Sequence, residues 1–457
     1  MTKAIILAAG QGSRMKSSLH KLMHPILGKT VIEYVVDAAR AAGIGEENMI
    51  VVVSPGATGI QESLTKRYPQ INFAVQETAL GTGHAVQAAA GYVQDNDNVI
   101  ILYGDMPLVE GEFIDGIVKS FGENKCAAMA TALYAPLLKD FGRVFFDAGS
   151  MFEEIVEARD LTTDHRPCDW VNPGVFMFRG TALHQGLAGM KNDNSQGEYY
   201  LTDVPKIIAE SGDVVRVFQT TTDPAMFTGI NTQAQLAEAA GYMRTRINNN
   251  HMANGVRMID PTNVYIDITV EIAQDTVVYP GVILEGACKI EKGAIVGVNT
   301  HMKDTILGEG AFIRQSVTDS AEIGAGTQVG PFAYLRPGTK IGKKCRVGNF
   351  VEIKNATLDD GAKMAHLAYI GDADVGKNVN YSCGAITANY DGKNKFRTTI
   401  KNNAFIGSNA NLVAPVTIGE GAFVAAGSTI TADLQDSSLG IARAKQVEKL
   451  NWKQEKA

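Results

Sequence analysis

A glycine-rich turn near the N-terminus contains the first residues suited to chemistry. Residues 4–15 read AIILAAGQGSRM, an apolar run followed by Gly10, Gly12 and Arg14, and Lys21 lies shortly beyond. The two glycines let backbone N–H groups approach an anion closely, and the two basic side chains supply positive charge. This pattern suits the phosphates of a nucleotide. It matches neither G-x-G-x-x-G nor the P-loop, which disfavours hydride cofactors and ordinary kinases.

A single carboxylate, Asp105, follows a second apolar run, VIILY, and Gly104. An aspartate in such a position is often only a helix cap or a turn former. The functional alternative is a Mg²⁺ ligand, because Mg²⁺ takes one or two protein oxygens and completes its octahedron with phosphate oxygens and water. A metal that bridges phosphates neutralises charge during attack at phosphorus. Asp105 is therefore a candidate metal ligand.

His366 is the third candidate. It lies in KMAHLAYIGDADVG, just before a repetitive pattern gives way to the polar segment SCGAITANYDGKNKFRTT, residues 382–399. The alternative is that His366 is a solvent-exposed histidine at a corner, without a chemical role. Long polar loops on a rigid scaffold often have a function, which favours a chemical role for this region.

The elements of the first half alternate between two periods. The runs 4–10, 49–54 and 99–105 look like buried strands, whereas 30–43 and 82–93 have apolar residues at helical spacing. This alternation predicts an α/β domain with a parallel, doubly wound, Rossmann-like sheet. Ligands of such sheets collect at the carboxyl ends of the strands, after Leu7 and after Tyr103.

The second half repeats with a period of six. The repeat has eighteen aliphatic anchors, at Ile266, Ile272, Val278, Leu284, Ile290 and Val296, at Ile323, Val329, Leu335, Ile341, Val347 and Ile353, and at Ile400, Ile406, Leu412, Ile418, Val424 and Ile430. This period predicts a left-handed parallel β-helix of hexapeptide repeats with roughly nine coils, interrupted by the loop 382–399. A purely structural solenoid is the alternative.

We therefore expect a nucleotide-transfer domain at 1–230, a linker helix at 231–254 with one stripe of Leu236, Ala240, Met243 and Ile247, and a β-helix domain at 255–457. The charged tail from Asp436 is predicted to be helical and to cover the coil end or reach a neighbour.

The composition excludes several classes of protein and of binding partner. The 457 residues are 45% apolar and 20% charged, which excludes general disorder. The net charge of −7 gives no global attraction to nucleic acid or to an anionic membrane. The five cysteines are scattered without a C-x-x-C pair, which disfavours disulfides and structural zinc. We expect a soluble, cytoplasmic protein without a leader or a membrane span.

Several motifs occur in the order found in sugar nucleotidyltransferases. After LAAGQGSRM and Lys21 come QETALGTGHAV (76–86), YGDMPL (103–108), FGRV (141–144), IVEARD (155–160), VNPGVF (171–176), QGEYYLTD (196–203) and GINTQAQL (229–236). With a hexapeptide β-helix behind them, the chain resembles the bacterial bifunctional family of N-acetylglucosamine-1-phosphate uridyltransferases and glucosamine-1-phosphate acetyltransferases. The resemblance covers almost the whole chain.

The resemblance implies two consecutive reactions. Acetyl-CoA would acetylate glucosamine-1-phosphate, and UTP with Mg²⁺ would then uridylate N-acetylglucosamine-1-phosphate and release pyrophosphate. The product, UDP-N-acetylglucosamine, supplies peptidoglycan and other cell-envelope precursors. Three alternatives stay open: a single-activity sugar-nucleotide pyrophosphorylase with a structural β-helix, an acetyltransferase with an inactive N-terminal domain, and a scaffold protein that uses the β-helix only to oligomerise.

The resemblance also assigns residues in the first domain. It implies a triphosphate site at Leu7, Ala8, Ala9, Gly10, Arg14 and Lys21, a uracil site at Gln76, Gly81 and Thr82, and further nucleotide contacts at Tyr103 and Gly104. The amino sugar would contact Gly142, Glu157 and Asn172, and Asp105 and Asn231 would hold Mg²⁺.

In the β-helix the resemblance makes His366 the general base that deprotonates the attacking amine, and a pKa near 6.5 suits that task. We add the hypothesis that Glu352 orients His366. The implied sugar-phosphate contacts are Arg336, Lys354, Tyr369 and Asn380, and the implied acetyl-CoA contacts are Cys383, Asn389, Tyr390, Ser408, Ala426 and Arg443. Hexapeptide acyltransferases resemble one another in that they form trimers, so the resemblance implies a homotrimer.

The sequence departs from the family pattern at a few positions. His20 and Thr30 stand where proline is usual, Pro173 stands where threonine is usual, and Cys383 stands where alanine is frequent. His20 and Pro173 are expected to alter the nucleotide loops. Without an evident basic neighbour, Cys383 is interpreted as a packing residue and not as a nucleophile.

Overall fold

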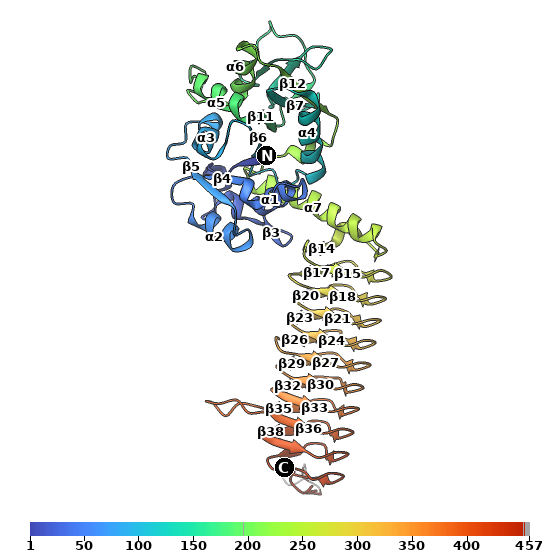
Figure 1. Cartoon of the computed structure of the whole chain (residues 1–457). Coiled ribbons are helices and arrows are strands. Elements are labelled where there is room, and N and C mark those ends of the chain that lie inside the picture. Colours follow the sequence, from blue (N-terminus) through green and yellow to red (C-terminus); the bar gives the residue numbers. More distant parts are fainter. Residues whose placement is uncertain (195, 451, 453–457) are drawn as a thin grey trace. The chain divides into compact units, whose positions relative to one another are not determined.

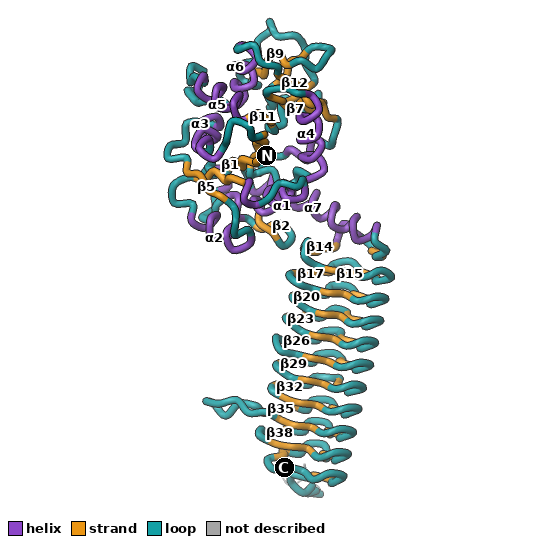
Figure 2. Tube along the Cα trace, in the orientation of Figure 1, coloured by secondary structure: helices purple, strands orange, loops and turns teal. Residues whose placement is uncertain are grey.

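The computed structural model describes residues 1–194, 196–450 and 452. The chain forms two compact units, Met1–Met243 and Arg244–Ala457. The ribbon of each unit is shown in Figure 1, and its helices and strands are distinguished in Figure 2. No helix among the described residues is long and apolar enough to cross a membrane.

The first unit is built on a 10-stranded sheet in the order β5-β4-β1-β6-β11-β7-β10-β8-β9, with β12 paired to β7. Its strands are β1 Thr2–Leu7, β4 Met49–Val53, β5 Asn72–Val75, β6 Asn98–Tyr103, β7 Ala128–Tyr134, β8 Arg143–Phe146, β9 Phe152–Val156, β10 Trp170–Val171, β11 Phe176–Arg179 and β12 Val215–Thr220. The strands expected at 4–10, 49–54 and 99–105 are β1, β4 and β6.

This sheet is mixed, so the expectation of a purely parallel sheet is wrong beyond β6. Strands β5, β4, β1 and β6 are parallel, but β11 runs antiparallel to both β6 and β7. The short strands β8, β9 and β10 add antiparallel pairs at the far edge. Antiparallel strands need no crossover helix, and the segment 128–179 accordingly has none.

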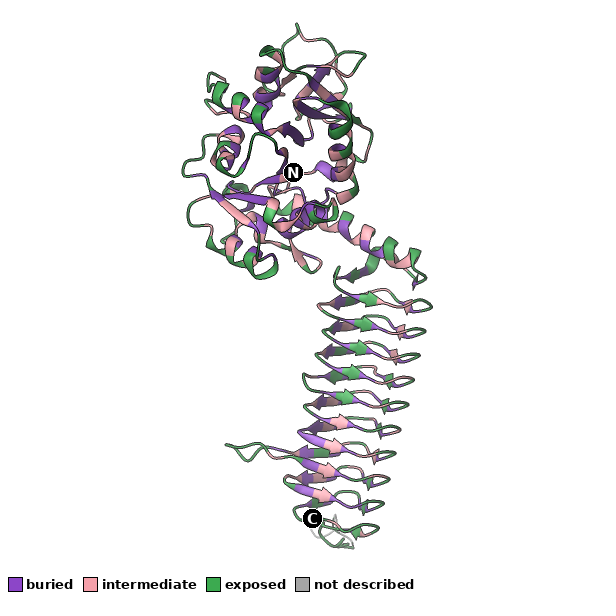
Figure 3. Cartoon of the chain, in the orientation of Figure 1, coloured by how far each residue is buried: buried purple, intermediate pink, exposed green. Residues whose placement is uncertain are grey.

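Seven α-helices are described: α1 Val31–Ala41, α2 Thr58–Arg67, α3 Thr82–Ala88, α4 Gly111–Asn124, α5 Gly180–Gly189, α6 Val204–Glu210 and α7 Gln233–Ala253. Buried side chains of α3, α5 and α6 join those of the sheet in one core, which includes Val86, Leu183, Val204 and Ile208. The sheet strands are coloured mostly as buried in Figure 3. The short 3₁₀ turns are η1 Ser13–Met15, η2 Lys21–Met23, η3 Glu46–Asn48, η4 Ala90–Tyr92, η5 Leu201–Asp203, η6 Pro224–Phe227 and η7 Pro261–Asn263, and β2 Pro25–Ile26 and β3 Lys29–Thr30 form a small hairpin.

The second unit is a parallel β-helix of three sheets. The first sheet contains β13 Arg257–Met258, β16 Val277–Val278, β19 Ile295–Val296, β22 Phe312–Ile313, β25 Gln328–Val329, β28 Arg346–Val347, β31 Lys363–Met364, β34 Asn380–Tyr381, β37 Phe405–Ile406, β40 Phe423–Val424 and β42 Leu439–Gly440. The second contains β14 Val264–Ile266, β17 Val282–Glu285, β20 His301–Lys303, β23 Val317–Asp319, β26 Tyr334–Leu335, β29 Glu352–Lys354, β32 Tyr369–Gly371, β35 Ile386–Ala388, β38 Asn411–Val413 and β41 Thr429–Ile430. The third contains β15 Glu271–Ile272, β18 Lys289–Ile290, β21 Ile306–Leu307, β24 Glu322–Ile323, β27 Lys340–Ile341, β30 Thr357–Leu358, β33 Ala373–Val375, β36 Thr398–Ile400 and β39 Val416–Ile418.

The hexad anchors point into this β-helix as expected. All eighteen are buried except Ile272, which is half-buried in the first coil. Stacked aliphatic side chains therefore form a continuous core in which each coil covers the next.

Two expectations for the second unit are wrong in detail. The loop is shorter than 382–399, because Ile386–Ala388 and Thr398–Ile400 belong to the coil as β35 and β36. The projecting part is a hairpin in which Tyr390 pairs with Lys395 (Figures 1 and 2). The tail is not helical over its described residues, since Leu439–Gly440 pairs with β40 and closes the last coil. Residues 451 and 453–457 of that prediction lie outside the described part of the chain.

Candidate active sites

The glycine-rich turn folds back over Lys21. Gly12 has a φ of 67°, and a Cβ at that position would lie 2.8 Å from the Cβ of Lys21. A side chain at residue 12 would therefore be strained and would displace Lys21. The turn leads into η1, which includes Arg14, and η2 begins at Lys21.

Lys21, Asp105 and Asn231 meet at the carboxyl ends of β1 and β6. Lys21 Nζ donates to Asp105 Oδ2 at 2.6 Å and to Asn231 Oδ1 at 3.2 Å. A backbone hydrogen bond also ties the segment of Asn231 to Asp105, because the N–H of the preceding residue, Ile230, donates to Asp105 O at 2.9 Å. The two side-chain oxygens thus converge on one cation, the Lys21 ammonium. A carboxylate oxygen and an amide oxygen are also ligands that Mg²⁺ prefers. Among the described residues, no group of three or more His, Cys, Asp or Glu side chains is placed to hold a metal.

A cavity of about 980 Å³ opens beside this cluster. It is lined by many of the expected residues, namely Arg14, Thr82, Tyr103, Asp105, Gly142, Glu157, Asn172, Pro173 and Asn231. Other expected residues are not among those that line it: Leu7, Ala8, Ala9, Gly10, Lys21, Gln76, Gly81 and Gly104. The volume is that of a ligand the size of a sugar nucleotide.

Gln76 is buried beside the N-terminus of α3. Its Nε2 donates to Gly81 O at 3.0 Å and lies 3.1 Å from His84 Nδ1. Gly81 has a φ of 110°, and a Cβ there would lie 2.6 Å from Tyr199 O. The amide nitrogen of Gln76 is thus engaged within the protein, and Gly81 is required by its close backbone neighbour.

The opposite side of the cavity contains carboxylate and amide groups. Glu157 Oε1 accepts from Thr202 Oγ1 at 3.1 Å, and burial raises the pKa of Glu157. Asn172 N donates to Gly142 O at 2.8 Å, and Asn172 Oδ1 accepts from Gly174 N at 2.9 Å. Pro173 therefore sits inside a tight Asn172–Gly174 turn and lines the cavity itself.

Asp203, at the end of η5, was not recognised from the sequence. Burial, followed by the carboxylates of Glu157, Asp193 and Asp160, raises the pKa of Asp203 to about 6. The folded state therefore prefers the neutral acid, which stabilises the fold below the unfolded pKa and loses this contribution as pH rises through about 6. We expect Asp203→Asn to raise Tm at pH 7.5 by roughly 2–4 °C, or about 1 kcal/mol after allowance for solvent screening, and to change it little at pH 4. Thermal melts at both pH values test this. A smaller gain at pH 7.5 than at pH 4 would contradict it.

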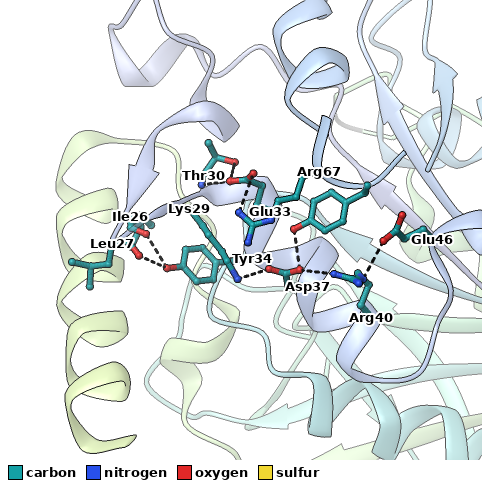
Figure 4. Close-up of polar contacts among 11 residues, drawn as sticks. Ile26, Leu27, Lys29, Thr30, Glu33, Tyr34, Asp37, Arg40, Glu46 and Arg67 are labelled. Carbon is teal, nitrogen blue, oxygen red and sulfur yellow. Dashed lines mark hydrogen bonds and ion pairs between the residues drawn. The ribbon is translucent and has the colours of Figure 1, made fainter. Parts of the chain in front are cut away.

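The hairpin that follows η2 is fixed by a polar network (Figure 4). Lys29 Nζ donates to Asp37 Oδ2 at 2.5 Å, and Tyr68 Oη donates to Asp37 Oδ1 at 2.9 Å. Thr30 caps α1 in a capping box, because Thr30 N and Oγ1 donate to Glu33 Oε2 at 2.7 and 3.0 Å. This gives Thr30 a structural role at the start of α1.

Five of the expected β-helix residues lie on one edge. His366, Cys383, Ser408, Ala426 and Arg443 follow β31, β34, β37, β40 and β42, at the turns between the first and second sheets. We call this set the first corner column. Gly384 N donates to His366 O at 3.0 Å, and Arg443 Nη1 donates to Ala426 O at 3.0 Å, so neighbouring coils are joined along it. At about 4.8 Å per coil the column extends over roughly 19 Å, which suits an elongated ligand.

His366 is exposed at a strained turn. His366 and Leu367 have φ values of 67° and 55°, and they are the only two consecutive non-glycine residues with positive φ in the described chain. Strain of this kind persists where the surroundings impose it and is concentrated at functional sites.

Cations gather at the next edge, where the second sheet turns into the third. Arg336 and Lys354 lie there on successive coils, since Arg336 N donates to Ile353 O at 2.8 Å. Lys395, from the projecting hairpin, is the main cause that lowers the pKa of Lys354, with burial and Arg336 adding to it. Three basic side chains thus lie near one another, with Asp372 opposing their effect on Lys354 and Glu352 paired with Arg336, and such a cluster suits a dianionic phosphate. The sequence did not identify Lys395 as a site residue, because only the fold of the hairpin brings it to Lys354.

A buried aspartate anchors the hairpin at this edge. Asp372 accepts from Asn355 Nδ2 at 2.6 Å and from Asn389 Nδ2. Burial acts to raise the pKa of Asp372, but these two hydrogen bonds together with the charges of Lys354 and Lys395 lower it. The amide nitrogen of Asn389 is therefore used within the protein. Tyr369 lies between the two edges on β32, and a Cβ at Gly371 would collide with both Tyr369 Oη and Asn389 Nδ2.

The contacts bear on three further expectations. Glu352 Oε1 accepts from Arg336 Nη1 at 2.9 Å, so its carboxylate is paired with a cation of the second edge, and the orienting role proposed for Glu352 toward His366 stays a prediction. Cys383 is exposed, so its interpretation as a packing residue is also wrong. Asn380 Nδ2 donates to Ser382 Oγ at 3.1 Å on the first sheet, apart from the cations of the second edge.

Comparison with known proteins finds matches in both units of the chain. Residues 4–164 match the MobA-like NTP transferase domain, and residues 320–355 and 397–432 match the bacterial transferase hexapeptide repeats. The chain is 44% identical to the bifunctional protein GlmU of Geobacillus sp. (strain WCH70), over 98% of this chain and 97% of the relative. The chain belongs to the GlmU family. GlmU of Alkaliphilus oremlandii is 44% identical over 99% of this chain and 98% of its own, and that of Clostridioides difficile is 41% identical over 99% and 98%.

As a GlmU protein, the chain is a bifunctional transferase with a left-handed hexapeptide β-helix. It acetylates glucosamine-1-phosphate and uridylates N-acetylglucosamine-1-phosphate in the synthesis of UDP-N-acetylglucosamine. Nucleotide and acetyl-CoA are its co-substrates.

Proposed function

We propose that uridyl transfer takes place in the cavity at the carboxyl ends of β1 and β6. The phosphate oxygen of N-acetylglucosamine-1-phosphate attacks the α-phosphorus of UTP, and pyrophosphate leaves. The proposal is supported by the cluster of Lys21, Asp105 and Asn231, because it puts a cation and two oxygen ligands beside Arg14 at one end of the cavity. No protein nucleophile is needed, since positioning and charge stabilisation do most of the catalysis.

The other expected residues of the first unit would bind the two ends of the substrates. Leu7, Ala8, Ala9 and Gly10 would present backbone to the triphosphate, and Gln76, Gly81, Thr82, Tyr103 and Gly104 would contact the nucleoside. Glu157, Asn172 and Gly142 would accept and donate hydrogen bonds to the sugar hydroxyls and the acetamido group. The raised pKa of Glu157 is compatible with a largely dehydrated sugar site.

Asp105 and Asn231 would hold Mg²⁺. When bound, this ion would offset the charge of the phosphates during attack. The fit rests on the convergence of Asp105 Oδ2 and Asn231 Oδ1 on the Lys21 ammonium, which would turn toward the phosphates when the oxygens bind the metal.

Acetyl transfer would use the first corner column and the adjacent cations. Arg336, Lys354 and Lys395 bind the phosphate of glucosamine-1-phosphate, and Tyr369 and Asn380 contact the sugar. His366 takes the proton as the amine attacks the thioester carbonyl, and the coenzyme A thiol leaves. Cys383, Ser408, Ala426 and Arg443 line the path of acetyl-CoA away from His366, and Asn389 and Tyr390 form the hairpin wall.

The quaternary structure is proposed to be a homotrimer through the β-helix. Phe332 and Phe350 stack at 5.3 Å between ring centroids and are 51% and 55% exposed, and Leu367, beside His366, is 66% exposed. Such an apolar ladder on successive coils is suited to a second copy of the same β-helix. The comparisons support oligomerisation through these repeats.

One reconstitution tests both sites together. Purified protein is incubated with glucosamine-1-phosphate, acetyl-CoA, UTP and Mg²⁺, and free thiol and pyrophosphate are followed separately. We expect both signals, with pyrophosphate release dependent on acetyl-CoA. Pyrophosphate from supplied N-acetylglucosamine-1-phosphate without any thiol release would leave only a uridyltransferase and would refute the acetyl-transfer assignment.

A further inference from the structure

His20 caps the 3₁₀ turn that begins at Lys21. Its φ and ψ are −57° and 139°, and its Nδ1 accepts from Leu22 N at 3.2 Å, so the imidazole satisfies an N–H that would otherwise be free at the start of η2.

This cap acts directly on the backbone of Lys21. Leu22, whose N–H is bound by His20, is buried, and its Cδ1 would lie 3.4 Å from a Cβ at Gly104, the residue before Asp105. The turn is therefore held at both ends, by the imidazole at its start and by apolar packing under Asp105. Lys21 lies between these two fixed points, which explains why its long side chain reaches Asp105 at 2.6 Å.

The surroundings of the imidazole favour its neutral form. The charged or titratable groups that face it are Lys21 and His24, together with the backbone of Gly10, and no carboxylate is among them. Burial, followed by the charges of Lys21 and His24, lowers the pKa of His20, with the Gly10 backbone opposing. Because Nδ1 accepts a hydrogen bond, the proton of the neutral ring is on Nε2, which is buried.

We propose that His20 is a positioning residue for Lys21 in uridyl transfer, with its neutral imidazole fixing the turn from which Lys21 reaches Asp105 and Asn231. An imidazolium has N–H groups on both nitrogens and cannot accept from Leu22 N. Protonation therefore removes the cap and adds a second positive charge beside Lys21. The inference rests on the proposed uridyl-transfer site and adds to it a pH-dependent component located in one residue.

The test compares wild type with His20→Asn, His20→Ala and Lys21→Ala in the full-length protein. Asparagine is chosen because its Oδ1 can accept from Leu22 N at every pH, whereas alanine cannot. Uridyl transfer is measured as pyrophosphate release from UTP and N-acetylglucosamine-1-phosphate between pH 5.5 and 8.5. The ratio of wild type to His20→Asn at each pH cancels the titration of the substrate phosphates. Thiol release in the acetyl-transfer assay is recorded on the same samples.

We expect His20→Asn to keep kcat/KM near the wild-type value at pH 8 and to exceed wild type increasingly as pH falls toward 5.5. His20→Ala should lose about fivefold in kcat/KM at pH 8, the equivalent of one lost capping contact. Acetyl transfer should be the same in wild type and both His20 variants. If the alanine variant does not fold, the pH dependence of the wild-type to His20→Asn ratio still tests the proposed role of His20.

Other results would overturn specific claims. A wild-type to His20→Asn ratio that is constant with pH would refute the proposed role of His20. A wild type that outperforms His20→Asn at acidic pH would mean that the imidazolium assists uridyl transfer, which also contradicts the proposed role of the neutral ring. Full uridyl transfer by Lys21→Ala would instead refute the proposed site itself, whereas loss in Lys21→Ala with unchanged His20→Ala would refute only the role of His20.

Discussion

His366→Ala should lower acetyl transfer by about 10² to 10⁴-fold and leave uridyl transfer unchanged. His366 is the only imidazole in the first corner column, and it is exposed at a strained pair of residues. Without it, the amine nitrogen must lose its proton to water as it attacks the thioester. Thiol release with saturating acetyl-CoA measures the loss, and pyrophosphate release from supplied N-acetylglucosamine-1-phosphate measures the other reaction on the same sample.

A second histidine of the β-helix provides the matched control. His301 lies on β20 of the second sheet, is 43% exposed, and has its Nε2 2.7 Å from Glu285 Oε2. His301→Ala removes an exposed imidazole from the same solenoid without touching the first corner column, so both activities should persist. Equal losses of acetyl transfer in the two variants would mean that the β-helix is merely sensitive to substitution, and His366 would lose its assignment as the base.

The β-helix was predictable because its signal is local and repeated. Each anchor, such as Ile323, Ile341 or Ile406, obeys one rule of burial, and many coils repeat that rule. The first sheet strands were predictable for the same reason, since β1, β4 and β6 each contain a continuous apolar run. The antiparallel return of β11 was not, because strand direction depends on pairing between distant segments and leaves little trace in a single run.

The sites show the same division between local and non-local information. The alignment of His366 with Cys383, Ser408 and Arg443 is hidden in the sequence, because the projecting hairpin lengthens one coil and breaks the regular spacing. Lys395 belongs to that hairpin, and Asp203 owes its raised pKa first to burial in the fold and then to carboxylates on other segments. The charged tail looked helical by composition, but its pairing with β40 made Leu439–Gly440 a strand, since tertiary contacts override weak local preference.

Asp105→Ala should abolish uridyl transfer, with a loss on the order of 10³-fold or more, and should leave acetyl transfer intact. The substitution removes the carboxylate that pairs with Lys21 at 2.6 Å and leaves that ammonium with Asn231 Oδ1 alone. It also removes the charged half of the proposed Mg²⁺ site. Pyrophosphate release with supplied N-acetylglucosamine-1-phosphate measures the loss, and thiol release reports on the second unit.

Asp105→Asn separates the two consequences, because it keeps an oxygen ligand and the shape of the side chain but removes the charge. It should retain more activity than alanine and should need more Mg²⁺ for its half-maximal rate, since a neutral amide binds the cation less tightly.

Asp115→Ala is the control, because Asp115 is an exposed carboxylate of α4 in the same unit whose i,i+4 pair with Lys119 contributes little. If Asp105→Ala folds normally yet loses both activities, the two sites are not independent and the assignment of Asp105 to uridyl transfer alone fails. If the asparagine variant shows an unchanged Mg²⁺ dependence, Asp105 acts only through Lys21, and the metal ligands must be sought elsewhere in the cavity.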